Sequence, residues 1–144
     1  MARVNLGKVL VGGLVAGVVI NISEFVLNMM VVGDASRAAM ERLGLPADPG
    51  SAGMTLYILM GFVLGILAVW LYAAIRPRYG PGPRTALLAG AAAWALFYGL
   101  CSIGFLASGM WPSGLIVIGL LWGFVELAVA TTIGAKLYTE AESA

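Results

Sequence analysis

The sequence contains no histidine and only one cysteine, Cys101, and it has no Cys-x-x-Cys motif. These absences exclude haem ligation by histidine, iron–sulfur clusters, thiolate zinc sites and intrachain disulfides, so we expect neither a cofactor nor a metal. Cys101 lies in an apolar run, where we expect a packing residue rather than a reactive thiol. The net charge is only +1, which gives no basis for nucleic-acid binding.

Charged residues are scarce as well: they make up 10% of the 144 residues, and 61% of the residues are hydrophobic. Soluble domains carry about 25% charged residues, so this chain cannot solvate a globular surface. Four stretches reach the ~20 apolar residues that a helix needs to cross ~30 Å of hydrocarbon. They cover residues 6–32, 52–75, 85–107 and 113–138. We therefore predict an all-α polytopic membrane protein, a compact bundle of four transmembrane helices in a single domain, 1–144.

The first apolar stretch is longer than the roughly 7–15-residue apolar region of a secretory signal, so we expect an uncleaved span. Basic residues precede this span, crowd the second connection and end the fourth span. They are Arg3, Lys8, Arg76, Arg78, Arg84 and Lys136. By the positive-inside rule, we expect both termini and the second connection on the cytoplasmic side of a plasma (inner) membrane.

The two longer connections have different characters. Residues 76–84 hold three prolines and two glycines, which predict a rigid break without helix. The arginines of this loop, Arg76, Arg78 and Arg84, either set topology alone or also bind the anionic headgroups of membrane lipids. In the first connection, Asp34 is expected to cap a short amphipathic helix, 35–43, that ends at Gly44 and lies at the outer interface.

Small residues form a narrow face on each predicted span. Lipid offers helices no hydrophobic reason to associate, so close packing through small residues must hold them together. The residues of these faces are Gly13 and Gly17, then Gly61 and Gly65, then Ala92, Ala95, Gly99 and Ser102, and last Gly119 and Gly123. The faces are expected to pack within one bundle or between copies of the chain.

Glu24 and Glu126 are the only charged residues deep inside the apolar stretches. A carboxyl at that depth costs roughly 2.5–3.5 kcal/mol on insertion scales, and it is a functional hypothesis by default. Each follows a glycine, Gly17 or Gly119, by seven residues, which places it on the glycine face of its helix. At 1.5 Å per residue the two carboxyls lie within ~6 Å of each other in height, so they can meet inside the bundle.

Two buried carboxyls without a buried basic partner cannot both be ionised at low cost. Three hypotheses follow for Glu24 and Glu126. They form a neutral clamp between helices, or they handle a proton or a cation, or they face a bound lipid or a partner helix. The candidate hydrogen-bond partners of a neutral clamp are Asn21, Asn28, Thr131 and Thr132.

Residues 40–46 read Met-Glu-Arg-Leu-Gly-Leu-Pro after a glycine-rich first span, and Trp122 and Gly123 lie in the last span. In this layout the chain resembles small bacterial membrane proteins of an uncharacterised four-helix family that carries a domain of unknown function. The resemblance covers nearly the whole chain and implies that fold in a bacterial membrane, but no activity and no functional residues. Small multidrug carriers also have four spans and a glutamate in the first, but they lack the long first connection and the second glutamate, so that similarity is architectural.

No Ser–His pair, metal cluster or phosphate-binding loop is present, so we do not expect an enzyme. Our first expectation is a self-associating protein or an accessory subunit of a larger membrane complex, held by the glycine faces. The alternative is a proton- or cation-coupled transporter or channel that uses Glu24 and Glu126. The two differ in whether these carboxyls line a cavity or are sealed between helices.

The topology is tested by cysteine labelling in intact cells. We expect a membrane-impermeant thiol reagent to label Ala38→Cys and Asp48→Cys from outside, because both positions lie in the connection that we place outside. The same reagent is expected not to reach Gly80→Cys. Labelling of position 80 would reverse the assignment.

Overall fold

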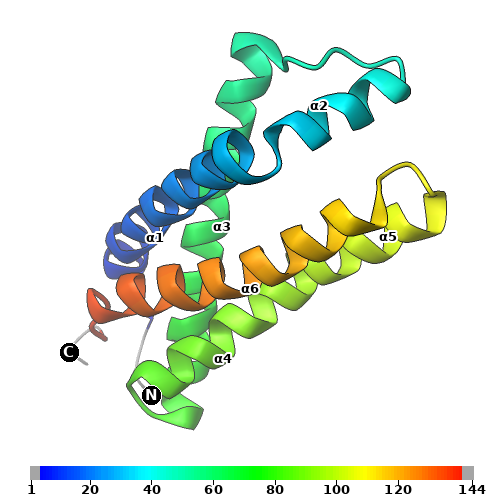
Figure 1. The fold of residues 1–144 in the computed structure, drawn as a ribbon. Helices are drawn as coiled ribbons and strands as arrows, with labels where there is room; N and C mark the ends of the chain where they lie inside the picture. The colour runs from blue at the N-terminus through cyan, green and yellow to red at the C-terminus, as the bar shows by residue number, and fades with distance from the viewer. Residues whose placement is uncertain (1–3, 141–144) are drawn as a thin grey trace.

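A computed structural model of the chain describes residues 4–140, so the basic residue Arg3 falls outside the described part. Over this range the chain is helical and contains no strand. Four helices are long and apolar enough to cross a membrane: Leu6–Val31, Gly50–Tyr79, Pro83–Ser108 and Ser113–Lys136. The protein is therefore an all-α, multi-pass membrane protein built as a four-span bundle (Figure 1).

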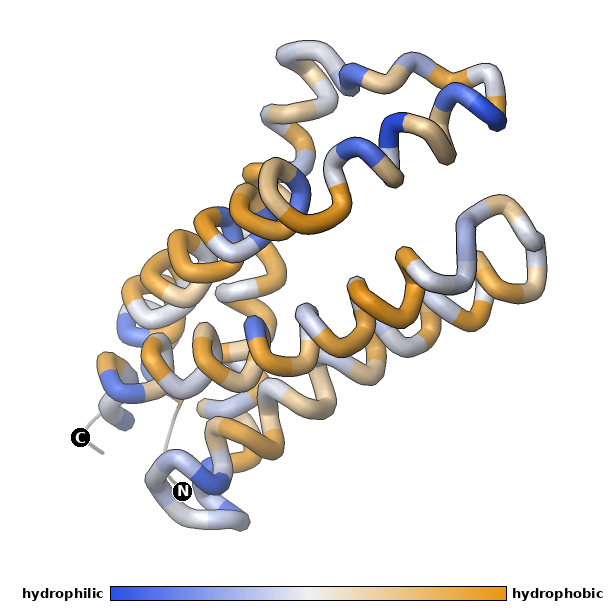
Figure 2. The backbone as a smooth tube through the Cα atoms, in the orientation of Figure 1, coloured by the Kyte–Doolittle hydropathy of each residue, from blue (hydrophilic) through white to orange (hydrophobic). Residues whose placement is uncertain are grey.

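Two of the four spans contain a wide π-helical turn. The first span consists of α1 (Leu6–Val26) and the π turn η1 (Leu27–Val31), and the third consists of α4 (Pro83–Trp94), the π turn η2 (Ala95–Gly99) and α5 (Leu100–Ser108). The second and fourth spans are α3 (Gly50–Tyr79) and α6 (Ser113–Lys136), and α2 (Gly33–Arg42) is the short helix of the first connection. Apolar residues dominate the spans, whereas polar residues gather in α2 and in the α3–α4 connection (Figure 2).

The core lies in the half of the bundle that contains the start of α1 and the ends of α3 and α6. α1 packs against α3 and α6, and α4 packs against α3 and α6. One cluster of buried side chains, including Ile20, Val69 and Leu127, fills the middle of the bundle. A second cluster surrounds Tyr72 and Tyr138, whose rings meet edge to face at 5.9 Å. Buried side chains therefore fill this half of the bundle, which we call the closed half.

Toward α2 and α5 the pair formed by α5 and the start of α6 diverges from α1–α2 and from α3 (Figure 1). None of the residues of α5 is buried, and the buried residues of α3 begin only at Gly61. The predicted compact packing thus describes the closed half, and the other half presents most of its side chains outward.

Glycines bring the backbones into contact in the closed half. A Cβ placed on Gly65 would lie 2.5 Å from the carbonyl oxygen of Gly13 and 2.9 Å from Cα of Gly17. A Cβ on Gly134 would lie 2.6 Å from the carbonyl oxygen of Gly12. No larger residue fits these positions without separating the helices, so α1 touches α3 and α6 through glycine.

The small-residue face of the third span differs from the predicted one. Ala92 and Ala95 are exposed, and the packed face is instead formed by Ala86, Ala89, Gly90 and Ala93. Gly90 faces α6, where an added Cβ would lie 2.8 Å from the carbonyl oxygen of Leu127. Ala92 precedes η2, so its exposure is decided by the side on which α4 meets α3 and α6. Within and after η2, the wide turn also shifts later residues around the axis, so a uniform 100° per residue no longer describes the face.

Gly119 also departs from its predicted role. An added Cβ at Gly119 would meet no atom within 4 Å, because this residue lies in the diverging half of α6. Gly13, Gly17, Gly61, Gly65 and Gly123, by contrast, all have neighbours that an added Cβ would approach within 3 Å.

Two predictions about the connections were wrong: the extent of the break between the second and third spans, and the cap of the short helix α2. α3 continues through Pro77 to Tyr79, because a proline in the last turn removes a single hydrogen bond. The break in the helix is confined to Gly80–Gly82, where Gly80 and Gly82 adopt φ of +83° and +132°. α2 begins at Gly33 without a side-chain cap, so Asp34 lies in its first turn, because the backbone leaves η1 directly into α2. The helix ends at Arg42, one residue before the predicted end, and Gly44 follows with φ +69°.

Replacing Gly65 with Leu tests the glycine contact. We expect Gly65→Leu to lower the free energy of unfolding by roughly 1–3 kcal/mol or more, since the side chain must push α1 away from α3. Gly104→Leu is the matched control, because an added Cβ at Gly104 meets no atom within 4 Å. The measurement is unfolding of the purified protein in mixed detergent micelles, and equal stability of the two variants would contradict the proposed contact.

Candidate functional site: a carboxyl–hydroxyl cluster between three spans

Three spans contribute one residue each to a polar cluster at the point where the helices diverge. Glu24 lies in the last turn of α1, Tyr98 lies in η2, and Glu126 lies in α6. Both π turns therefore border the cluster, since η1 begins three residues after Glu24 and η2 contains Tyr98 itself. Single π turns inside α-helices occur frequently at functional sites.

The hydroxyl of Tyr98 bridges the two carboxyls. It lies 2.8 Å from Oε1 of Glu24 and 2.8 Å from Oε1 of Glu126. A phenol has a single hydroxyl hydrogen and can donate to only one of these oxygens. The other contact is a hydrogen bond only if that carboxyl is protonated and donates to the Tyr98 oxygen. The geometry thus requires at least one proton shared by Glu24 and Glu126.

The two carboxyls differ in their remaining contacts. Oε2 of Glu24 accepts a hydrogen bond of 3.0 Å from the amide of Asn28, and Glu24 is half-buried. Glu126 is only 4% exposed, and its Oε2 has no hydrogen-bond partner among the described residues. The ion pairs within residues 4–140, Arg37–Asp34 and Arg76–Glu140, both lie away from the cluster. Glu126 is therefore enclosed without a basic partner, and the side chain of Ser23 is its remaining polar neighbour.

Packing holds the Tyr98 ring in place. A Cβ on Gly123 would lie 2.8 Å from the Tyr98 ring, so glycine at this position lets the ring lie against α6. The ring of Phe97 meets it edge to face at 5.5 Å. These contacts leave the ring little freedom to carry its hydroxyl away from the carboxyls.

Two indole groups tie α6 to its neighbours around the cluster. Nε1 of Trp122 donates to Oγ of Ser23 over 2.8 Å, which joins α6 to α1 beside Glu24. Nε1 of Trp94 donates to the carbonyl oxygen of Leu120 over 2.9 Å, which joins α6 to α4. The three spans that supply the cluster are thus cross-linked by hydrogen bonds close to it.

A cavity of about 540 Å³ adjoins the cluster between α1 and α6. Its walls are mostly aliphatic, and its polar groups come from Ser23, Trp122 and Glu126. The lining residues are Val19, Ser23, Ile118, Leu121, Trp122, Val125, Glu126 and Val129. Glu126 therefore belongs both to the cluster and to the wall of the cavity, whereas Glu24 contacts the cluster alone.

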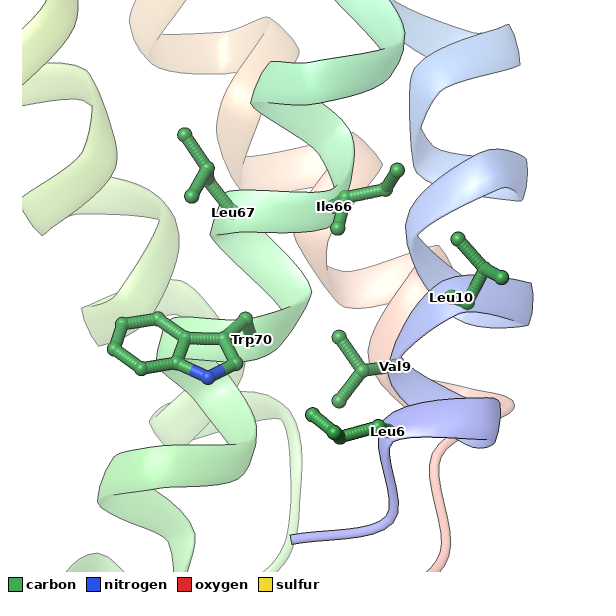
Figure 3. Close-up of a pocket in the computed structure, with 6 residues that line it drawn as sticks. All are labelled: Leu6, Val9, Leu10, Ile66, Leu67 and Trp70. Atoms are coloured by element: carbon green, nitrogen blue, oxygen red, sulfur yellow. The ribbon is translucent and has the colours of Figure 1, made fainter.

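A second cavity, of about 440 Å³, lies between α1 and α3 nearer the chain ends (Figure 3). It is lined by Leu6, Val9, Leu10, Ile66, Leu67 and Trp70. These side chains contain no titratable group, so this cavity has no chemistry beyond apolar contact.

The structure brings together Glu24, Glu126 and Asn28 of the predicted polar residues, but it places Asn21 elsewhere. Nδ2 of Asn21 donates to the carbonyl oxygens of Gly17 and Ile58, over 2.8 and 3.2 Å, and so links α1 to α3. Thr132 donates to a backbone carbonyl in its own helix. Its neighbour Thr131 is buried, and its hydroxyl has no partner within residues 4–140. Neither threonine reaches the carboxyls.

Sequence reasoning missed Tyr98, Ser23 and Trp122. Tyr98 did offer a signal, because it lies fifteen residues into the third helical span, at a depth of ~23 Å. Tyrosines otherwise favour the membrane interfaces, so a hydroxyl this deep needs a polar partner. Ser23 and Trp122 gave no comparable signal, since their pairing depends on how α1 and α6 are rotated.

The three arginines predicted to bind lipid headgroups fall into two groups. Arg78 and Arg84 are exposed at the α3–α4 connection. The guanidinium of Arg76 instead lies over the Tyr138 ring, 5.4 Å from its centroid, and its Nε is 3.6 Å from Oε1 of Glu140. Arg76 therefore contributes to packing of the chain ends, and the lipid prediction concerns Arg78 and Arg84.

Chemically, the cluster can pass a proton between two carboxyls. If Glu24 donates to the Tyr98 oxygen while the Tyr98 hydroxyl donates to Glu126, one concerted shift moves a proton charge from one acid to the other.

Groups of three or more metal-ligating side chains are not found within residues 4–140. Comparisons of the chain with protein-family models, curated proteins and solved structures find no match.

Tyr98→Phe tests the bridge. Removing the hydroxyl leaves Oε1 of both glutamates without their partner, so we expect a loss of roughly 1–3 kcal/mol in the free energy of unfolding. Tyr57→Phe is the matched control, because Tyr57 is 54% exposed. Unfolding in detergent, followed by circular dichroism, measures both variants. An unchanged stability of Tyr98→Phe would show that the hydroxyl does not bridge the acids.

Proposed function

We propose that this chain is a non-enzymatic protein of the bacterial inner membrane that moves protons or small cations. In this proposal the side chains of Glu24, Tyr98 and Glu126 carry the proton or bind the cation. In keeping with the distribution of basic residues, both termini are placed in the cytoplasm. The observation that carries the proposal is the position of Glu126. It is buried, it shares Tyr98 with Glu24, and it is one of the residues that border the cavity between α1 and α6.

A purely structural clamp accounts for this arrangement less well. A well-packed apolar pair is often more stable than buried ionisable groups, so a contact that only stabilises the bundle does not need two acids. Glutamine would provide the same bridging oxygen for Tyr98 without a titratable proton. An uncompensated acid beside a cavity is, however, what a proton or cation relay needs.

Access to the cluster differs between its two sides. On the side of α2, Asn28 is exposed and Glu24 is half-buried, so the cluster is approached from the diverging half of the bundle. Toward the chain ends, the fully buried Ile20, Leu127 and Ala130 close the space between the helices. An open channel needs a path through both sides, so this geometry supports a transporter that is open to one side.

Self-association or service as an accessory subunit is the second candidate. Gly104, Gly114 and Gly119 lie in the diverging half, and an added Cβ at any of them would meet no atom within 4 Å. Helix contacts in lipid depend on small residues, so these uncovered glycines offer α5 and α6 a surface for a second copy or another membrane subunit. A four-helix bundle also encloses little volume, so transport and assembly are compatible.

Flux measurements in liposomes test the transport proposal. We expect the wild-type protein to dissipate an imposed pH gradient or membrane potential, and Glu126→Gln to reduce this flux to that of protein-free vesicles. The reason is that glutamine keeps the hydrogen bond to Tyr98 but cannot release a proton. Glu41→Gln is the matched control, because Glu41 is exposed and distant from the cluster in sequence.

The thermal stability of each variant in detergent is measured alongside its flux. Full flux in a folded Glu126→Gln protein would contradict the relay. Wild-type vesicles that hold folded protein but show no flux under any gradient would favour the assembly candidate, which cross-linking in native membranes would then examine directly.

A further inference from the structure

The side chain of Ser23 is the polar neighbour of Glu126 that the Tyr98 bridge does not use. We propose that the Ser23 hydroxyl is the second hydrogen-bond donor to an ionised Glu126, and that the Trp122 indole positions it for this role. The pair thereby controls how readily Glu126 releases its proton. This inference rests on the proposed function and deepens it, because it names what regulates the same site.

The bond between Trp122 and Ser23 fixes which of the two groups donates. Nε1 of Trp122 lies 2.8 Å from Oγ of Ser23. An indole nitrogen can only donate, so the Ser23 oxygen accepts this bond and keeps its single hydroxyl hydrogen for another acceptor. Ser23 is therefore a donor whose own acceptor lies elsewhere.

That acceptor is not the backbone of α1. Hydroxyl side chains inside helices often donate to the carbonyl oxygen four residues earlier. Thr55 and Thr132 do so, over 2.9 and 2.7 Å, whereas Ser23 makes no such bond within residues 4–140. The bond from Trp122 instead holds the Ser23 oxygen toward α6, the helix that carries Glu126.

On α6 the acceptor beside Ser23 is Glu126. α1 and α6 pack against each other, and the Ser23 side chain is a polar neighbour of the Glu126 carboxyl. Oε1 of Glu126 is 2.8 Å from the Tyr98 hydroxyl, whereas Oε2 is fully enclosed and has no hydrogen bond within residues 4–140. The hydrogen that Ser23 retains and the oxygen that lacks a donor therefore belong to adjacent side chains.

A second donor matters most when Glu126 is ionised. In the proton shift, the proton of Glu126 passes to the Tyr98 oxygen while the Tyr98 hydroxyl hydrogen passes to Oε1 of Glu24. Glu126 is then a carboxylate with Tyr98 as its one donor. A hydrogen bond to a charged group contributes more than a bond to a neutral group. A bond from Ser23 therefore stabilises the ionised state of Glu126 more than the protonated state and eases proton release.

The titratable groups around Glu126 do not supply this second donor. Glu24 of α1 and Tyr98 of η2 face Glu126. α3 and α4 also pack against α6, but within residues 4–140 they place no titratable or charged side chain beside Glu126. Glu24 donates its new proton to the Tyr98 oxygen, and Tyr98 has a single hydroxyl hydrogen. Ser23 is thus the group that adds a donor.

Infrared titration of the full-length protein, in a detergent without carbonyl groups, tests the proposal. The part of the protonated-carboxyl band that is lost in Glu126→Gln reports on Glu126. We expect Ser23→Ala to move the midpoint of this signal upward by about one pH unit, a tenfold higher proton affinity, because the ionised state loses a charge-assisted donor. Ser23→Thr keeps the hydroxyl and is expected to titrate as the wild type does.

Two tryptophan variants separate positioning from stability. Trp122→Phe releases the Ser23 hydroxyl and is expected to move the midpoint in the same direction by a smaller amount. Trp94→Phe is the matched control, because it removes a similar indole bond to α6, at the carbonyl oxygen of Leu120, that involves no hydroxyl. It is expected to keep the wild-type midpoint. The comparison of these two variants decides the question if Ser23→Ala does not fold.

A folded Ser23→Ala protein with the wild-type midpoint would overturn the proposal, as would a Ser23→Thr midpoint displaced as far as that of Ser23→Ala. Equal midpoints for Trp122→Phe and Trp94→Phe would also overturn it. The titration does not require flux, so the two proposals fail separately. A displaced midpoint without flux under any gradient would support the role of Ser23 and remove the transport proposal. Glu126-dependent flux with an unchanged Ser23→Ala midpoint would do the reverse.

Discussion

The contact of the α1 backbone with α3 and α6 through glycine determines the geometry of the rest of the molecule. Lipid gives these helices no hydrophobic reason to associate, so dispersion forces and hydrogen bonds between closely approaching backbones must hold them. The contacts of Gly65 with Gly13 and Gly17, and of Gly134 with Gly12, also fix the relative heights of the helices. From the Gly12–Gly134 contact, Glu24 lies twelve residues along α1 and Glu126 eight residues back along α6, an offset of ~6 Å. The Tyr98 hydroxyl, 2.8 Å from each carboxyl, bridges this offset.

The polar cluster lies where this close packing ends. On one side are the buried residues of the closed half, and on the other the helices separate, so Glu24 is half-buried while Glu126 is almost completely buried. Two acids with a similar chemistry therefore have different surroundings. Both side-chain oxygens of Glu24 are hydrogen-bonded, to Tyr98 and to Asn28, whereas Glu126 is bonded to Tyr98 through Oε1 and its Oε2 is fully enclosed. The two ends of the Tyr98 bridge are therefore not equivalent.

The wide turns η1 and η2 contribute to this arrangement. Each interrupts the regular helix next to a residue of the cluster, and each occurs in a span whose second half leaves the closed core. A π turn lets a side chain project in a direction that a regular helix would not allow. On α6, Gly123 has no side chain and so leaves room for the Tyr98 ring. The cluster thus depends on irregular backbone in two spans and on a glycine in a third.

Composition and the length of the apolar stretches determined that this is an all-α protein with four candidate spans, because the low proportion of charge and the ~20-residue apolar runs suit only lipid as a solvent. The similar heights of Glu24 and Glu126 also followed from counting residues, since the rise of a helix is constant. Rotation about the helix axes was decided only by the tertiary structure. The packed face of α4 contains Ala93 in place of Ala92, Asn21 donates to α3, and Tyr98 enters the cluster. Each of these depends on which neighbour the helix meets, and the direction of Tyr98 also depends on the π turn η2. Hydropathy is nearly uniform around these spans, so apart from the glycine stripes a single sequence does not mark which side of a helix faces lipid and which faces another helix.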